Sequence, residues 1–213
     1  MKNIRLKICG MKYSENIQEI AALKPDYLGF IFWDKSSRKF ELKELPKLDS
    51  NIKKVGVFVD PSLEEIQNKI KTFQLDVIQL HGKESVDYCA NLKNEKVEII
   101  KAFSINNDFD FNQLKAYENV VDFFLFDTKG KLPGGNGTTF DWQVLENYNL
   151  QKPFFLSGGI GLTEINKIQE FVDSELSKYC YAIDVNSRFE TEPGLKNKID
   201  LEKFKKLLYE NKI

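Results

Sequence analysis

The sequence has few cysteines, and they are not spaced as a metal site or a disulfide framework would need. The three cysteines, Cys9, Cys89 and Cys180, form no CxxC pair, and the chain has only one histidine, His81. Zinc sites and disulfide-stapled scaffolds depend on such spacings, so the sequence predicts neither. Free cysteines fit a reducing compartment, and we therefore expect a cytoplasmic protein without a metal ion.

An excess of one charge and long hydrophobic runs are also absent. The 213 residues include 31 Lys and Arg against 32 Asp and Glu, which gives a formal net charge of -1. This balance argues against nucleic acid or an anionic membrane as a partner. No apolar stretch approaches the ~20 residues that span a bilayer, and Lys2, Arg5 and Lys7 interrupt any N-terminal signal region. We expect a soluble protein, as a monomer or a homodimer, that acts on a small molecule.

Short apolar segments of strand length alternate with amphipathic segments of helical period along the whole chain. A single (β/α)8 TIM barrel over residues 1–213 accounts for this alternation better than an open doubly wound sheet. The helical pattern at 42–48 is weak because Pro46 interrupts it. The expected strands are 4–9, 27–32, 54–59, 77–82, 98–103, 123–127, 153–158 and 181–185, and the other helical segments are 14–24, 61–73, 84–93, 111–117, 142–148, 163–172 and 200–210.

A barrel carries its functional groups at the C-terminal ends of its strands. Side chains alternate along each strand between the barrel interior and the helix layer. Ile4, Leu6 and Ile8 form the apolar set that should face the helices, so Lys7 and Cys9 should point inward. By the same parity an amide, an imidazole and two carboxylates converge on one mouth: Gln79, His81, Asp127 and Asp184.

Cys9 has two possible roles. Free cysteine is among the most buried residue types, and most such residues only fill space. However, Cys9 ends its strand just before Gly10, with Lys7 two residues below it on the same face. A neighbouring ammonium lowers the pKa of a thiol from about 8.5 toward neutrality, and the resulting thiolate is a nucleophile or a general base. Cys89 and Cys180 are expected to be structural.

Three loops at the same end of the expected barrel contain residues suited to binding. Asp127 precedes a glycine-rich loop (Gly130, Gly134, Gly135 and Gly137), which we expect to be mobile and to close over a ligand. The glycines of "LSGGIG" (157–161) follow the seventh strand, where such barrels bind phosphate. Arg38, one of three arginines, lies in a polar loop after the second strand and can pair with a carboxylate. Asp127 is equally suited to anchoring the loop that follows it. His81 is also consistent with a buried core residue whose hydrogen bonds are satisfied.

The chain resembles the phosphoribosylanthranilate isomerase family of tryptophan biosynthesis in seven stretches. In order along the chain, these are "KICGM", "LGFIFWDKSSRKF", "VGVFV", "IQLHG", "LFDTKGKLPGGNGTTFDW", "FFLSGGI" and "DVNSRFETEPGLKNKID". The resemblance implies an Amadori rearrangement of a phosphosugar, N-(5-phosphoribosyl)anthranilate, without a metal or organic cofactor. The product is 1-(2-carboxyphenylamino)-1-deoxyribulose 5-phosphate.

By these motifs, Cys9 corresponds to the general base and Asp127 to the general acid, while Arg38 corresponds to the residue that binds the anthranilate carboxylate. Where the family has a glycine after the eighth strand, this chain has Arg188, so the loop either tolerates the side chain or gains a cation for the phosphate. The other substrate-binding residues implied are Lys7, Gln79, His81 and Asp184, and the phosphate-binding residues are Gly158, Gly159, Asn186, Ser187 and Arg188.

Two other functions compete with this one. The related isomerase of histidine biosynthesis performs similar chemistry, but its pattern has an aspartate at the end of the first strand, where this chain has Cys9. A non-catalytic barrel that binds a phosphorylated ligand belongs to a different class. The presence of both Cys9 and Asp127 argues against it.

Overall fold

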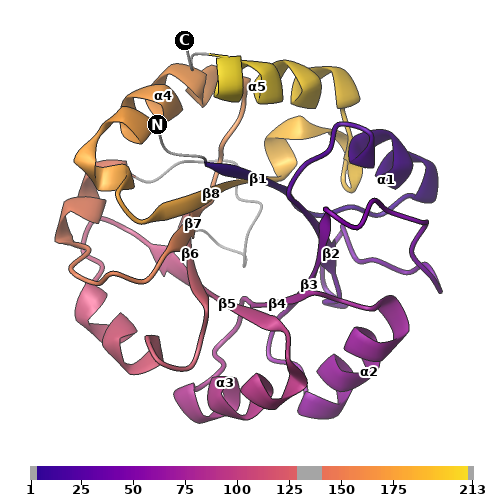
Figure 1. Ribbon diagram of the computed structural model, residues 1–213, viewed down its shortest axis with the longest axis horizontal. Helices are drawn as coiled ribbons and strands as arrows, with labels where there is room; N and C mark the ends of the chain where they lie inside the picture. Colours follow the sequence, from indigo (N-terminus) through magenta and orange to yellow (C-terminus); the bar gives the residue numbers. More distant parts are fainter. Residues whose placement is uncertain (1–3, 129–140, 211–213) are drawn as a thin grey trace.

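The computed structural model describes residues 4–128 and 141–210, so the glycine-rich loop expected to close over a ligand lies outside the described residues. Eight parallel strands pair in chain order and close into a barrel, which Figure 1 shows end on. β1 closes the ring by pairing with β8, with Lys7 opposite Asp184. The strands are β1 (Arg5–Ile8), β2 (Tyr27–Ile31), β3 (Lys53–Phe58), β4 (Val77–Leu80), β5 (Glu98–Ile105), β6 (Phe123–Thr128), β7 (Phe154–Leu156) and β8 (Cys180–Val185). The barrel predicted from the sequence is therefore confirmed.

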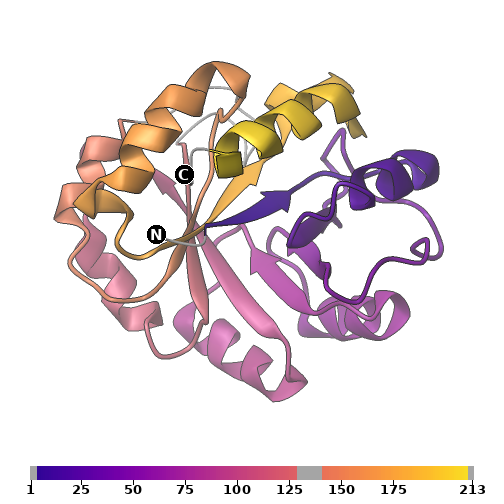
Figure 2. The same cartoon turned by 45° about the horizontal axis from the view of Figure 1, so that its top comes forward.

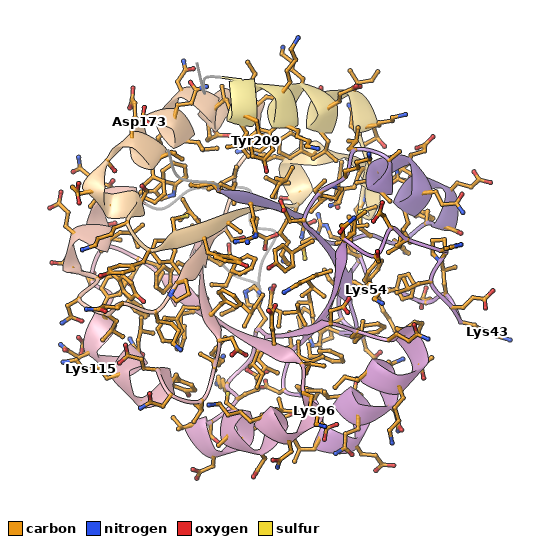
Figure 3. The ribbon with its side chains drawn as sticks, viewed as in Figure 1. Lys43, Lys54, Lys96, Lys115, Asp173 and Tyr209 are labelled. Carbon is orange, nitrogen blue, oxygen red and sulfur yellow. The ribbon has the colours of Figure 1, made fainter. Side chains whose placement is uncertain are left out.

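Helices surround the barrel on its outside in both Figure 1 and Figure 2. Each packs an apolar face against the strands: Ile66 of α2, for example, is fully buried. Figure 3 shows Tyr209 on the barrel side of α5, whereas Lys43 and Lys115 project outward. No helix among the described residues is long and apolar enough to cross a bilayer. The α-helices are α1 (Ser14–Ala21), α2 (Leu63–Phe73), α3 (Val86–Leu92), α4 (Ile165–Asp173) and α5 (Lys198–Glu210).

Several connections differ from the regular alternation that the sequence predicted. The segments expected to form helices at 111–117 and 142–148 are helical, but of the 3-10 type: η2 (Phe111–Tyr117) and η3 (Trp142–Asn147). Each follows an aspartate whose side chain accepts a hydrogen bond from the backbone N–H of the second residue of the helix, as aspartate does at the start of helices and turns. No helix lies between β2 and β3, where Pro46 interrupts the pattern. The remaining 3-10 segments are η1 (Lys93–Glu95), η4 (Leu162–Glu164), η5 (Glu175–Ser177) and η6 (Ser187–Phe189).

A short hairpin follows the barrel and was not predicted. β9 (Glu190–Glu192) pairs antiparallel with β10 (Leu195–Lys196), between β8 and α5. Gly194 makes the turn with a φ of 89°, in the left-handed region that glycine adopts without strain. The hairpin packs against α1 through hydrogen bonds between the Lys196 backbone and the Asn16 side chain, and Gly194 lies against the side chain of Lys12, just before that helix.

The parity assigned to the first strand is confirmed. Ile4, Leu6 and Ile8 lie in the apolar layer between barrel and helices, while Cys9 belongs to the cluster inside the barrel. Aromatic rings fill the lower part of the interior, with the Arg5 guanidinium 4.2 Å from the centre of the Tyr181 ring. The closely packed rings are those of Tyr27, Phe123, Phe155 and Tyr181. This filled base leaves the open space at the C-terminal mouth of the strands.

Candidate active site

A pocket opens at the C-terminal mouth of the barrel and brings together every site residue predicted from the sequence except Lys7. Three further residues, which were not predicted, line the same pocket from the loop that carries Arg38: Trp33, Lys35 and Ser36. Their position in that loop was the available signal. The predicted residues that line the pocket are Cys9, Arg38, Gln79, His81, Asp127, Gly158, Gly159, Asp184, Asn186, Ser187 and Arg188.

Lys7 lies below the pocket and forms a buried ion pair with Asp184. Its Nζ is 2.7 Å from Asp184 Oδ2, and neither side chain is more than 5% exposed. Burial alone would lower the pKa of Lys7, but the carboxylate of Asp184 and the nearby thiol of Cys9 raise it above its usual value. The second carboxylate oxygen, Asp184 Oδ1, is buried without a hydrogen bond among the described residues.

Cys9 lies at the end of β1, and two glycines shape its surroundings. A side chain at Gly29 of β2 would place its Cβ 2.8 Å from Cys9 Sγ, so glycine there makes room for the thiol. Gly10 has a φ of 80°, which turns the chain sharply after Cys9. Burial raises the pKa of the Cys9 thiol, although the ammonium groups of Lys7 and Lys196 act to lower it. The prediction that Lys7 brings this pKa toward neutrality is therefore wrong, because desolvation outweighs the neighbouring charges.

Gln79, His81 and Asp127 form a polar row across β4 and β6. Gln79 Nε2 lies 3.3 Å from His81 Nδ1, and His81 Nε2 lies 3.4 Å from Asp127 Oδ2. Asp127 Oδ1 accepts the backbone N–H of Thr128 at 2.9 Å. Gln79 Oε1 and His81 Nε2 are buried without a hydrogen-bond partner in the described part of the chain.

The turn after β7 lies against the end of β6. Gly158 and Gly159 both have positive φ, at 97° and 64°. A Cβ on Gly158 would lie 2.2 Å from Thr128 Oγ1, so this contact requires glycine. The exposed side chain of Arg188 extends along the same pocket from the loop after β8. Glycine backbone and a nearby cation are the features that an oxyanion site needs.

Arg38 does not point freely into the pocket but is held by Glu190 of β9. Arg38 Nε donates to both carboxylate oxygens at 2.9 Å, and Nη2 donates to Oε2 at 2.7 Å. Lys196 of β10 completes the group, with Nζ 2.7 Å from Glu190 Oε1. Burial alone would raise the pKa of Glu190, but Arg38 and Lys196 hold it below its usual value. Neither Glu190 nor Lys196 was predicted from the sequence as a site residue.

Metal ligation has no candidate among residues 4–128 and 141–210, where no three His, Cys, Asp or Glu side chains are grouped to hold an ion. What the pocket offers is proton-transfer chemistry. A thiol, a carboxyl group, an imidazole and an amide line one space. Such groups act as general acids and bases.

Comparisons with known proteins identify relatives along nearly the whole chain. Residues 6–208 match the family described as N-(5′-phosphoribosyl)anthranilate (PRA) isomerase. The N-(5′-phosphoribosyl)anthranilate isomerase of Parabacteroides distasonis is 42% identical over 208 residues, covering 95% of this chain and 91% of the relative. The phosphoribosyl anthranilate isomerase of Thermus thermophilus superposes with a TM-score of 0.82 at 25% identity, covering 98% of this chain and 100% of the relative. A third relative is a phosphoribosyl anthranilate isomerase in complex with reduced 1-(o-carboxyphenylamino)-1-deoxyribulose 5-phosphate. It superposes with a TM-score of 0.78 at 27% identity, covering 96% of this chain and 98% of the relative.

Proposed function

Since the chain belongs to the N-(5′-phosphoribosyl)anthranilate isomerase family of tryptophan biosynthesis, we propose that it converts N-(5-phosphoribosyl)anthranilate into 1-(2-carboxyphenylamino)-1-deoxyribulose 5-phosphate. The observation that carries the proposal is the single pocket that both Cys9 and Asp127 line. Three buried polar atoms, Gln79 Oε1, His81 Nε2 and Asp184 Oδ1, have no partner among the described residues there. Buried polar atoms need partners, and the hydroxyl groups of a sugar supply both donors and acceptors.

The first step requires an acid beside the ring oxygen. We assign this role to Asp127, whose Oδ1 is fixed by the Thr128 amide while Oδ2 faces His81. A proton from Asp127 reaches the ring oxygen, and the nitrogen lone pair breaks the bond between C1′ and that oxygen. The products of the step are an open-chain iminium and the Asp127 carboxylate.

The second step requires a base at C2′, and we assign it to Cys9 as the thiolate. The iminium acidifies the C2′ proton, which the thiolate removes, and the electron pair forms the C1′=C2′ bond and neutralises the nitrogen. The resulting enolamine becomes the ketone when C1′ gains a proton and the C2′ hydroxyl loses one. Lys7 and Lys196 favour the thiolate against the cost of its burial. Every step is a proton transfer, so we propose that no metal or organic cofactor takes part.

The two anionic ends of the substrate fit the two cationic sides of the pocket. We propose that Arg38 binds the anthranilate carboxylate, since its Nη1 makes no hydrogen bond to a described residue. We expect the phosphate to lie against the backbone of the glycine turn after β7 and beside Arg188. The phosphate-binding group proposed is Gly158, Gly159, Asn186, Ser187 and Arg188.

A coupled fluorescence assay tests the function. Phosphoribosylanthranilate is generated in situ, its fluorescence decay is followed with and without added protein, and the product is identified by mass and chromatography. We expect the protein to accelerate the decay and to yield the ketose product. No acceleration at micromolar protein would contradict the enzyme assignment and favour a barrel that only binds a phosphorylated ligand.

A further inference from the structure

The hairpin after β8 is fixed to the body of the barrel at Lys196. The backbone N–H of Lys196 donates to Asn16 Oδ1 at 2.8 Å, and its carbonyl accepts from Asn16 Nδ2 at 2.9 Å. This side chain belongs to α1, so the hairpin is held by an element other than its own. From the hairpin, the Lys196 side chain contacts Asn186 and the Glu190 side chain contacts Arg38, and both partners line the pocket.

Glu190 fixes the orientation of the Arg38 guanidinium. Its carboxylate occupies the Nε and Nη2 edge of the guanidinium through three hydrogen bonds of 2.7–2.9 Å. The end formed by Nη1 and Nη2 therefore keeps donors for a second carboxylate. Glu190 is 4% exposed and Arg38 17%, so water competes only weakly for this pair.

Lys196 links the same carboxylate to the loop beside Cys9. Its ammonium is fully buried and lies 2.7 Å from both Glu190 Oε1 and Asn186 Oδ1. Asn186 packs on Gly10, where a Cβ would approach Asn186 Oδ1 to 2.6 Å and Arg38 Cδ to 3.0 Å. Gly10 is therefore enclosed by the two residues that this ion-pair group holds, and it directly follows Cys9.

We propose that Glu190 and Lys196 are positioning residues, which hold the Arg38 guanidinium with its free end toward the substrate carboxylate and hold Asn186 against the Cys9–Gly10 turn. The proposal rests on the proposed function for the nature of the ligand. It assigns a task to the "RFETEPGLKNK" segment (188–198), which the acid–base chemistry itself does not use. A positioning role predicts that loss of the Glu190 charge weakens substrate binding more than the proton transfers.

Steady-state kinetics of Glu190→Gln separate these effects, with Glu192→Gln as the matched control. Glu192 is on the same strand and carries the same charge, but it is exposed. We expect Glu190→Gln to raise KM by about tenfold and to change kcat by less than about threefold, on the scale of a hydrogen bond to a charged group. In an Arg38→Ala background the same substitution should change KM by less than about twofold. An unchanged or lower KM for Glu190→Gln, or an equal effect in both backgrounds, contradicts the proposal.

A spectroscopic measurement tests the same idea without activity. The chain has only three arginines, Arg5, Arg38 and Arg188, so the Nε–H region of a 15N spectrum is simple, and an Arg38→Lys variant identifies the Arg38 signal. We expect hydrogen exchange at Arg38 Nε–H to accelerate by about tenfold in Glu190→Gln. It should keep its wild-type rate in Glu192→Gln. Unchanged exchange in Glu190→Gln refutes the positioning role even if the isomerase is active. If the wild-type protein has no isomerase activity but exchange is still faster in Glu190→Gln than in wild type, the contact is upheld and the proposed function is refuted.

Discussion

The ion pair between Lys7 and Asp184 offers a quantitative test of how burial governs charge in this barrel. Its Nζ–Oδ2 distance is 2.7 Å, and the two side chains are 0% and 5% exposed. The pair of Lys53 and Glu98 is a natural control, with a distance of 2.6 Å but exposures of 40% and 34%. The two pairs therefore have nearly the same geometry and differ in their access to water.

Lys7→Met leaves the Asp184 carboxylate buried without its partner, which costs about 3–5 kcal/mol. Asp184 relieves part of this by taking up a proton, so the lower end of that range applies. Lys53→Met removes a partner that water replaces, which costs about 0.2–1 kcal/mol. With a urea m-value of about 2 kcal/mol/M, the unfolding midpoint should fall by about 1.5 M for Lys7→Met and by at most about 0.5 M for Lys53→Met.

Urea unfolding followed by tryptophan fluorescence and far-UV circular dichroism measures both shifts. The double variant Lys7→Met/Asp184→Asn should recover most of the loss, because it no longer buries an uncompensated charge. Equal midpoint shifts for Lys7→Met and Lys53→Met would refute the reasoning, since burial would then not decide the cost.

Two further predictions concern residues around the pocket. Gly10→Ala should destabilise the fold by about 1–3 kcal/mol and lower turnover, because an alanine is strained at a φ of 80° and its Cβ meets Asn186 Oδ1 at 2.6 Å. The urea midpoint measures the loss of stability, and the fluorescence assay measures the loss of turnover. An unchanged urea midpoint in Gly10→Ala would contradict the prediction. The pKa of Glu190 lies below its usual 4.5 in the folded protein, so its contribution to stability is present above pH 4.5 and is lost as the pH falls through the folded-state pKa. The urea midpoint of wild type should therefore fall more steeply below pH 4.5 than that of Glu190→Gln, and parallel pH profiles would contradict this.

The period of the apolar residues was sufficient to predict the barrel and the mouth at which polar groups meet. Alternation along β1 placed Ile8 toward the helices and Cys9 inside, and the structure agrees. This succeeds because strand parity is a local property that the sequence carries directly. The helical segments expected at 111–117 and 142–148 are present, but their 3-10 geometry was not predicted, because an apolar face of this length suits either kind of helix.

What the sequence could not provide depends on contacts between distant segments. Arg38 and Glu190 are 152 residues apart, and no local pattern pairs them. Lys196 lies in a strand of two residues, too short to show a period. The direction in which the Cys9 pKa shifts was also missed. The neighbouring residues in the sequence reveal the charge of Lys7, but not the extent of burial that outweighs it.

The central claim, that Cys9 and Asp127 are the base and the acid, is tested most directly by single-turnover rates of Cys9→Ala and Asp127→Asn. The matched control is Cys89→Ala, which removes a buried thiol in α3, away from the pocket. Removal of an acid or base should slow turnover by about two to four orders of magnitude, with the control within about threefold of wild type. Near-normal turnover in both Cys9→Ala and Asp127→Asn would contradict the claim.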